Sequence, residues 1–471
     1  MSEATTTPCP QCSILQQQLE ALQQQVQNLQ ATIDKLQTQL AAKSKNSSTS
    51  SKPPSSDLVK PTSRTDSPRA AGGQPGPPHH QRVLFPPEAL NGGCHSHQLP
   101  ACPGCGHELL SLGTPPRIVQ QLDIQDVPLR IEEHRSVAGW CPQCDVVHHA
   151  PLPVGIERGG LVGPRLTTLI AYLKGVCHAS FSTVRKFLRD IVGVTISRGQ
   201  LSKIVGKVSA ALDQPYQELL RVLPDQAVLN VDETGHKNNG ERWWTWCFRG
   251  SLYTLFKIDP TRSGDVLLQV LGEDFDGVLG CDYFSAYRRY MRECSVTVQF
   301  CLAHLIREVR FLTTLPDRAE RAYGERLIEA FKELFGVIHR RESLSAKGFA
   351  QALSVARQQV LRVGMAAVPS GKHSQNLAER FRKHGESYFR FVTTPGVEPT
   401  NNVAEQAIRF VVIDRHITQG TRSPSGRQWC ERIWTVMATC AQQGRSVFEY
   451  LRQAVEGHFG GETAPSLLGN Q

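Results

Sequence analysis

A series of short apolar segments in the middle of the chain constrains its fold more than any other feature. Two of them alternate apolar and polar residues as hairpin strands do, and a stretch of helical length at residues 263–271 follows them. The five strand-like segments are residues 227–231, 242–249, 252–258, 277–280 and 297–300. Three successive strands, a helix and two further strands predict an α/β domain. The 471 residues suffice for about two to four folding units, so we expect a multidomain chain.

An aspartate follows two of the strand-like segments: Asp232 comes directly after residues 227–231, and Asp282 comes after residues 277–280 and Cys281. Open α/β sheets present ligands at strand ends, and Mg²⁺ prefers carboxylate oxygens. One aspartate on each of two adjacent strands can hold two ions, which activate a hydroxyl and stabilise the leaving oxygen of a phosphodiester. This is the layout of a ribonuclease-H-like sheet. An aspartate at a strand end is also common as a turn or helix cap, so the residues alone leave both interpretations open.

A third carboxylate, carried by a later helix, would complete such a metal site. Glu405 is the candidate, because Pro399 with Thr400 or Asn401 favours a helix start just before it. Glu398 is the alternative. It precedes the proline, and we expect it in the loop.

Basic segments flank the acidic centre of the chain. Residues 160–225 contain nine Lys and Arg against four Asp and Glu, residues 226–300 contain eight against ten, and residues 301–471 contain 23 against 16. Basic surfaces attract phosphate backbones, and an acidic centre between them is typical of a divalent metal site. A solvated, mildly basic surface explains the same totals equally well.

Two C-x-x-C pairs lie within residues 84–155, which we interpret as a zinc-binding domain. They consist of Cys102, Cys105, Cys141 and Cys144. Four thiolates suit a closed tetrahedral Zn²⁺ site, and two such knuckles on hairpins form a zinc ribbon whose metal is part of the core. The alternative is two redox pairs or unligated core cysteines. A further pair, Cys9 and Cys12, has no mate nearby.

The N-terminal region predicts a coiled coil at residues 13–42 and a disordered linker at residues 43–83. Apolar residues recur at alternating spacings of four and three from Leu15 to Leu40, with Gln filling many of the other positions. The core positions of this heptad repeat are Val26 and Ile33 at a, and Leu22, Leu29 and Leu36 at d. These residue types favour a parallel dimer, whereas a lone amphipathic helix packed on its own domain is the alternative. The linker is rich in Ser, Pro and Gly, which cannot bury enough apolar surface to fold.

Residues 160–215 predict a helical DNA-binding region. A helical apolar pattern is broken by a short glycine-containing turn, after which Ser197 can cap a new helix. This is a helix-turn-helix signature, and its second helix presents Arg198, Lys203 and Lys207. Many helix pairs of this kind do not bind DNA.

Composition limits the class of protein. Hydrophobic residues make up 40% of the chain, which excludes a wholly disordered protein. The sequence has no apolar stretch of about 18 residues and no signal peptide pattern, so we expect no membrane association and a cytoplasmic location.

Several motifs in one order resemble those of transposases of insertion sequence family 66. The heptad repeat is followed by a Ser- and Pro-rich linker, a Gly-Gly-Gln-Pro-Gly segment and the two C-x-x-C pairs. The later motifs are Val-Asp232-Glu-Thr, Gly280-Cys-Asp282-Tyr, Cys301-Leu-Ala-His304 and Asn401-Asn-Val-Ala-Glu405-Gln-Ala-Ile-Arg409. The resemblance extends from the coil to the last helices.

The resemblance implies a DDE transposase with Asp232, Asp282 and Glu405 as ligands of two Mg²⁺ or Mn²⁺ ions. Such an enzyme nicks DNA at the terminal inverted repeats of its element by hydrolysis and uses the freed 3′-hydroxyl to attack target DNA. No covalent enzyme intermediate is expected. The implied partners are these DNA ends, the target DNA, a second copy of the chain and small accessory transposition proteins.

The resemblance also implies how the second half of the chain is organised. The ribonuclease-H-like catalytic domain spans residues 225–430. A helical insertion at residues 305–395 separates the second aspartate from the glutamate, and residues 431–471 form a C-terminal helical element.

Two further elements of the family pattern have less certain roles. Cys301 and His304 match a C-x-x-H element, for which a structural hydrogen bond and a DNA contact are both open, with a slight preference for the structural role. The family usually has Arg directly after the glutamate, where this chain has Gln406, so one phosphate contact is missing. Arg409, one turn along the same helix, remains as a DNA-binding candidate.

Three functions compete at this point. The leading one is a DNA transposase that cuts and joins strands with a divalent metal. The alternative is a catalytically inactive, zinc-dependent DNA-binding regulator derived from a transposase, and the third is a general nuclease of the same fold.

Overall fold

The computed structural model describes residues 10–43, 45, 84, 86–89, 129–141, 143 and 145–468. The chain divides into two compact units, one of which consists of residues 62–133 and 191–193. In that unit, a short 3₁₀ helix, η2, covers Pro87–Ala89. The sheet and the candidate site belong to the other unit. No described helix is both long and apolar enough to cross a membrane.

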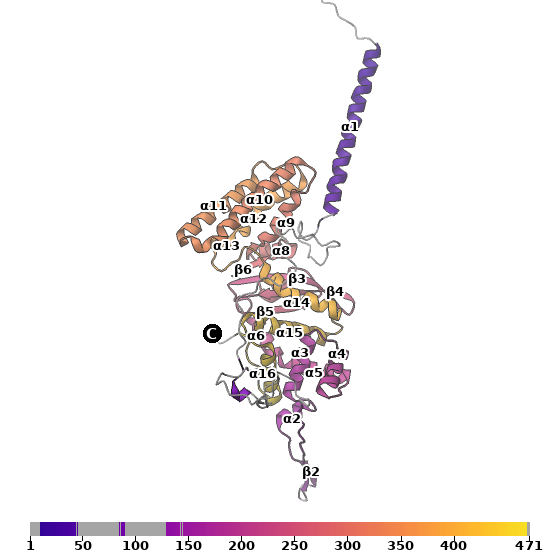
Figure 1. Ribbon diagram of the computed structural model, residues 1–471, viewed down its shortest axis with the longest axis vertical. Coiled ribbons are helices and arrows are strands. Elements are labelled where there is room, and N and C mark those ends of the chain that lie inside the picture. The colour runs from indigo at the N-terminus through magenta and orange to yellow at the C-terminus, as the bar shows by residue number, and fades with distance from the viewer. Residues whose placement is uncertain are drawn as a thin grey trace, which may run out of the picture. The chain divides into compact units, whose positions relative to one another are not determined.

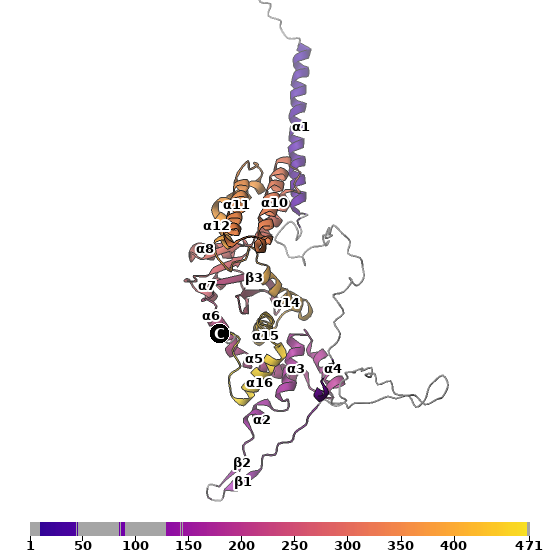
Figure 2. The same cartoon turned by 60° about the vertical axis from the view of Figure 1, so that its left-hand side comes forward.

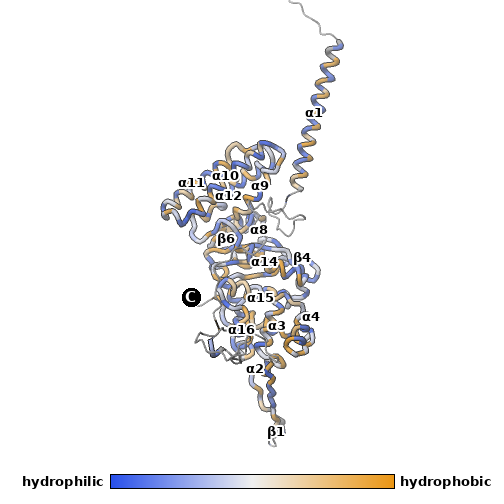
Figure 3. Tube along the Cα trace, in the orientation of Figure 1, coloured by the Kyte–Doolittle hydropathy of each residue, from blue (hydrophilic) through white to orange (hydrophobic). Residues whose placement is uncertain are grey.

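A single long helix, α1, covers Pro10–Lys43, the range in which the heptad repeat predicts a coiled coil. Its apolar seam is exposed in the single chain, and Leu22, Val26 and Leu29 have exposed fractions of 59%, 63% and 63%. Figure 3 shows apolar residues recurring between hydrophilic ones along this helix. The seam therefore has no partner among the described residues.

A two-stranded antiparallel hairpin carries the second C-x-x-C pair. It consists of β1 (Ala138–Cys141) and β2 (Val146–His149). Cys141 is the last residue of β1, which agrees with a knuckle at a hairpin turn. The other three predicted zinc ligands, Cys102, Cys105 and Cys144, lie outside the described residues.

Helices follow the hairpin, as the apolar pattern predicts. They are α2 (Val154–Gly159), α3 (Pro164–Gly175), α4 (Phe181–Phe187), the π-helix η3 (Leu188–Val192), α5 (Arg198–Ala211) and α6 (Asp213–Val222). The predicted cap is confirmed, because Ser197 Oγ accepts a hydrogen bond from the Gln200 N–H at 3.2 Å. Helix α5 buries Leu201, Ile204 and Val208, which lie on one face at helical spacing.

The centre of the protein is a five-stranded mixed sheet with strand order β5-β4-β3-β6-β7 (Figure 1). Its strands are β3 (Val228–Asn238), β4 (Glu241–Arg249), β5 (Thr254–Asp259), β6 (Val278–Cys281) and β7 (Thr297–Phe300). Strands β3, β4 and β5 are antiparallel, whereas β3, β6 and β7 are parallel. All five predicted strands are present in the predicted order.

Strand β3 is longer than the apolar run that predicted it. We expected the strand to end at Asp232, but β3 continues to Asn238. The reason is the turn at Asn239 and Gly240, whose φ angles of 52° and 84° suit a tight hairpin and allow β3 and β4 to pair up to Asn238 and Glu241. Asp232 therefore lies within β3, just beyond the part of β3 that pairs with β6.

Different helices cover the two faces of the sheet. Helices α7 (Asp265–Leu271) and α8 (Ser285–Glu293) lie on one face, where the ring of Tyr287 meets Trp246 edge to face at 6.1 Å. On the other face, α14 (Asn402–Thr418) packs on β3 and β4. Since side chains alternate along β3, Asp232 and Thr234 point toward α14, whereas Glu233 points toward α8.

Helix α15 (Pro424–Gln442) lies along β5, which is the edge strand on that side of the sheet. Three of its side chains, one per turn, accept hydrogen bonds from alternate backbone N–H groups of β5. The pairs are Glu431 with Ile258, Thr435 with Phe256 and Thr439 with Thr254, at 2.7, 3.0 and 3.2 Å. The side chains of this helix therefore supply the hydrogen-bond acceptors that backbone N–H groups of an edge strand otherwise lack. The helix also crosses residues 430 and 431, where we expected one domain to end, and α16 (Val447–Gly460) follows it.

The predicted helical insertion is a group of helices between β7 and α14 (Figure 2). They are α9 (Leu302–Leu312), α10 (Arg318–His339), α11 (Ala346–Met365), α12 (Lys372–Tyr388) and α13 (Arg390–Thr393), with a 3₁₀ turn, η4 (Arg341–Ser343), before α11. Helix α10 packs on both α9 and α11, and α12 reaches β7. The insertion is thereby attached to the sheet beside β7.

Candidate active site

The register of the two central parallel strands brings Asp232 and Asp282 to the same place. Asn230 of β3 is paired with Gly280 of β6, and each aspartate lies two residues beyond this pair. A Cβ atom at Gly280 would come within 2.4 Å of the side-chain nitrogen of Asn230, so the Asn230 side chain occupies the space that a larger residue at position 280 would need. Asp282 is further fixed because its Oδ1 accepts a hydrogen bond from the Phe284 N–H at 2.8 Å.

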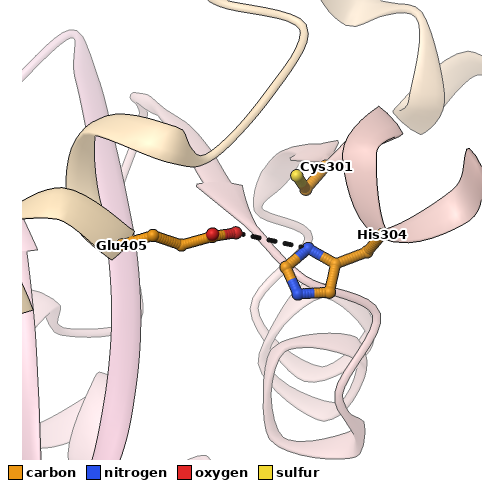
Figure 4. A group of neighbouring side chains, drawn as sticks. All are labelled: Cys301, His304 and Glu405. Atoms are coloured by element: carbon orange, nitrogen blue, oxygen red, sulfur yellow. Dashed lines mark ion pairs between the residues drawn. The ribbon is translucent and has the colours of Figure 1, made fainter. Parts of the chain in front are cut away.

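Glu405 lies in the first turn of α14, as the Pro399–Asn401 segment predicts. Its Oε1 is 3.5 Å from Nδ1 of His304, and its Oε2 is 3.8 Å from the Arg307 guanidinium (Figure 4). Both Glu405 Oε1 and His304 Nδ1 are buried and have no hydrogen-bond partner among the described residues. The glutamate is therefore only loosely held.

Asn401, the N-cap residue of α14, connects this helix to the sheet. Its side-chain amide donates to the Val231 carbonyl at 2.7 Å and accepts from the Asn230 amide at 2.9 Å. Its backbone N–H donates to Cys301 Sγ at 3.2 Å. With an exposed fraction of 2%, Asn401 ties the start of the Glu405 helix to the strand that carries Asp232.

Neighbouring carboxylates raise the pKa values of the two aspartates of the site. Burial, followed by the charges of Glu233, Asp282 and Glu405, raises the pKa of Asp232 well above its usual value. Burial and Glu233 raise the pKa of Asp282 to about 6, with a smaller contribution from Glu405. The charges of these neighbours therefore act on both aspartates, and a cation beside Asp232 and Asp282 would stabilise the charged forms of the two aspartates.

Glu233 is a buried acid that the sequence analysis did not select. Its carboxylate pairs with the Arg262 guanidinium at 2.6 Å and accepts a short hydrogen bond from the Tyr287 hydroxyl. The side chain points to the α8 face, away from the face of Asp232. The signal that could have found it is the alternation of the strand, which places consecutive acids on opposite faces.

The C-x-x-H element lies beside Glu405. Among the described residues, one set of three metal-ligating side chains has all its ligand atoms within 4.8 Å of one another, and it consists of Cys301, His304 and Glu405. The carboxylates of Asp232, Asp282 and Glu405 are less tightly grouped. Burial raises the pKa of the Cys301 thiol, and burial with Arg307 lowers the pKa of His304 to about 4.

Cys301 is already engaged in a structural contact. Its sulfur accepts the hydrogen bond from Asn401, its own N–H donates to the Cys281 carbonyl at 2.8 Å, and its exposed fraction is 2%. A buried, protonated thiol of this kind is a poor metal ligand. These contacts favour the structural role for Cys301 over a DNA contact.

The predicted DNA-binding residues have different surroundings. Arg198 and Lys203 are exposed on α5, and Arg409 is exposed one turn beyond Glu405 on α14. The Lys207 ammonium instead donates to the backbone carbonyls of Arg158 and Gly159 at 2.6 and 3.1 Å, at the end of α2. These bonds give Lys207 a structural role.

Comparison with known proteins identifies relatives of this chain. Two uncharacterized proteins of Sinorhizobium fredii (strain NBRC 101917 / NGR234), y4hP and y4qI, are 22% and 24% identical to it over 357 and 346 residues. These matches cover 67% and 66% of this chain but only 63% and 62% of the two relatives, so the chain spans less than two thirds of their length.

Two family models match different parts of the chain. Residues 6–83 match a family of unknown function (DUF6444). Residues 159–428, which include the whole sheet, the helical insertion and Glu405, match the model described as the transposase IS66 family. Because that match covers more than half of the 471 residues, the chain belongs to the IS66 family of transposases.

Proposed function

We propose that this protein is a DDE transposase that cuts and joins DNA strands with a divalent metal bound by Asp232, Asp282 and Glu405. One observation carries the proposal. Asp232 on β3, Asp282 directly after β6 and Glu405 in the first turn of α14 span 173 residues of sequence, yet they lie close enough that the charge of Glu405 contributes to the raised pKa values of both aspartates. Crowded carboxylates with raised pKa values are typical of a site that binds cations.

The arrangement of the sheet supports a ribonuclease-H-like core. Three successive antiparallel strands are followed by a helix and two parallel strands, which is the layout predicted for that fold. Asp232 belongs to β3, Asp282 directly follows the neighbouring strand β6, and Glu405 belongs to a helix that follows the helical segment. We therefore propose residues 225–430 as the catalytic domain and residues 305–395 as its insertion.

Each residue of the proposed site would have its own role in holding the metal ions. Asp232 and Asp282 would hold Mg²⁺ or Mn²⁺ from the sheet, and Glu405 would hold it from the helix. The bound metal would supply an activated hydroxyl and neutralise charge at the leaving oxygen. Glu405 loses little by turning toward the aspartates, because its contacts with His304 and Arg307 are long. Asn401 keeps α14 at the required distance from β3.

DNA binding and assembly would come from the remaining regions. Arg198, Lys203 and Arg409 are exposed cations suited to phosphate contacts, in a helix-turn-helix at residues 160–215 and on α14. We propose that Cys102, Cys105, Cys141 and Cys144 bind Zn²⁺ within residues 84–155. We also propose that α1 pairs with a second copy, because its exposed heptad seam has Val and Ile at a and Leu at d.

The proposal is tested with the DNA that flanks the gene. The full chain is incubated with a duplex carrying these flanking sequences, with Mg²⁺, with Mn²⁺ or with EDTA, and nicks are mapped on a sequencing gel. A transposase cuts at a fixed terminal position and leaves a 3′-hydroxyl only when metal is present.

Each competing function predicts a different result in this assay. Binding without any metal-dependent nick would favour the inactive regulator. Cutting of unrelated duplexes at the same rate would favour a general nuclease. A duplex whose ends are replaced by an unrelated sequence of equal length is the control.

A further inference from the structure

A cluster of cationic and aromatic side chains lies directly after the second aspartate. The Tyr283 cluster, as we define it, consists of Tyr283, Arg288, Arg380 and His384. Tyr283 follows Asp282, Arg288 belongs to α8, and Arg380 and His384 belong to α12 of the helical insertion. The cluster therefore joins the sheet to the insertion at the site.

Two guanidinium groups lie over the Tyr283 ring. Arg288 and Arg380 have their central carbon atoms 4.5 and 4.3 Å from its centroid, and the His384 ring meets Tyr283 edge to face at 5.5 Å. Cation–π contacts hold arginine by its face and leave its N–H donors free for an anion.

The Tyr283 cluster has more hydrogen-bond donors than the described residues around it have acceptors for them. Arg380 pairs with Glu308 at 2.8 Å, whereas the Arg288 side chain has no ion pair and no hydrogen bond with any described residue. Nε of Arg288 and Nδ1 of His384 are buried, and within the described parts of the chain neither has a hydrogen-bond partner. A buried donor without a partner is costly, and a ligand that accepts a hydrogen bond from Arg288 would offset that cost.

The local charge is positive. Burial and then the charges of Arg288, Lys383 and Arg380 lower the pKa of His384. Glu308 pairs with Arg380, and Glu379 pairs with Lys383 at 3.1 Å. Arg288 is thus left without a counter-ion, which favours an anionic ligand.

We propose that the Tyr283 cluster binds a backbone phosphate of the DNA strand that enters the carboxylate site. The inference rests on the proposed function and adds an anchor for the substrate next to Asp282. A phosphate satisfies the bidentate N–H donors of Arg288, which a base stacked on Tyr283 would not, because guanidinium groups already lie over that ring. The helical insertion would thereby contribute directly to substrate positioning.

The test is the salt dependence of DNA binding by the full chain. A fluorescein-labelled duplex of mixed sequence is titrated with wild-type protein and with Arg288→Gln between about 50 and 200 mM salt, and anisotropy is measured. Loss of one phosphate contact weakens binding and lowers the slope of log K against log salt by about 1. Arg288→Lys, which keeps the charge, should restore most of the slope.

The matched control is Arg382→Gln, which removes the same charge from an exposed position on α12 that pairs with Glu379. This variant should keep the wild-type slope. His384→Asn provides a second test if Arg288→Gln lowers the melting temperature, and it should weaken binding at unchanged slope when histidine is neutral.

The outcomes separate the inference from the proposed function. If the wild type binds DNA and Arg288→Gln matches it in affinity and slope, the phosphate anchor is wrong and the transposase proposal is untouched. If the wild type binds no duplex, both are wrong. Equal slope losses in Arg288→Gln and Arg382→Gln would show a general charge effect and would also overturn the anchor.

Discussion

Two regions of the sheet differ in whether their polar groups have hydrogen-bond partners: the β5 edge, and the place where β3 and β6 stop pairing. At β5, three backbone N–H groups each have a side-chain acceptor on α15. Around Asp232, by contrast, burial and neighbouring carboxylates raise the pKa values of Asp232 and Asp282, and Glu405 and His304 keep buried atoms without hydrogen-bond partners among the described residues. Satisfied polar groups stabilise a fold, whereas unsatisfied ones are retained where a ligand is expected to bind. Within one sheet, the β5 edge therefore has polar groups that stabilise the fold, and the Asp232 region has polar groups that are available to a ligand.

The largest effect is expected from removing a carboxylate of the site. Asp232→Asn, Asp282→Asn and Glu405→Gln should each lower strand cleavage by at least about a thousandfold, because each deletes a metal ligand worth several kcal/mol in the transition state. DNA binding should stay nearly unchanged. Cleavage is measured on the flanking-sequence duplex, and wild-type rates in any one variant would contradict the assignment.

The side-chain nitrogen, the side-chain oxygen and the backbone N–H of Asn401 each have a hydrogen-bond partner. Asn401→Ala should lower the free energy of unfolding by about 2–3 kcal/mol, because Asn230 and the Val231 carbonyl lose their partners in a buried place. Cleavage should also fall, since Glu405 is no longer tied to β3. Asn402→Ala, at the exposed next position, is the control, and equal destabilisation by both variants in urea denaturation would argue against this role.

His236 lies on β3, and its ring meets Trp434 of α15 edge to face at 6.1 Å. This histidine predicts a pH dependence of stability. Burial, with the charges of Arg415 and Arg427, lowers its pKa to about 4, while its Nε2 lies 3.0 Å from Thr421 Oγ1. Between pH 6.5 and 4 the unfolded chain binds a proton that the folded chain does not, so stability falls as the pH falls. The loss should reach about 2 kcal/mol at pH 5. Melting temperatures of His236→Gln should fall less over this range than those of the wild type, and parallel pH profiles would refute the prediction.

The smallest effect is expected at the α15 contact with β5. Thr435→Val keeps the shape of the side chain and leaves the Phe256 N–H without an acceptor, at a cost of about 1–2 kcal/mol. Cleavage per folded molecule should stay at the wild-type level. Gln428→Ala, at an exposed position of the same helix, is the control and should change stability little. Reduced cleavage by folded Thr435→Val would contradict a purely structural role for the α15 contact with β5.

The strands and the two aspartates could be predicted from the sequence because each rests on a local signal. Apolar runs predicted β6 and β7, and the acid after β6 was found correctly. The end of β3 was wrong, because the apolar run stops at Val231 while the Asn239-Gly240 turn extends the hairpin. That turn is a strong local signal, and recognising it would have corrected the boundary.

The contacts that assemble the site depend on residues far apart in the sequence. Asn401 contacts Asn230, and Tyr283 contacts Arg380, across segments of the chain that no local pattern relates. The same holds for α15, whose Thr435 and Thr439 resemble ordinary helix residues until β5 is placed beside them. Periodicity predicts elements, but it does not predict which side chains meet between them.

The most direct test of the central claim is Mn²⁺ binding, followed by electron paramagnetic resonance on the full chain. The wild type should bind Mn²⁺, and Asp232→Asn and Asp282→Asn should each weaken that binding at least about tenfold because a ligand is lost. Glu398→Gln, which changes the exposed acid before Pro399, should bind as the wild type does. Unchanged Mn²⁺ binding in both aspartate variants would contradict the claim that these carboxylates form a metal site.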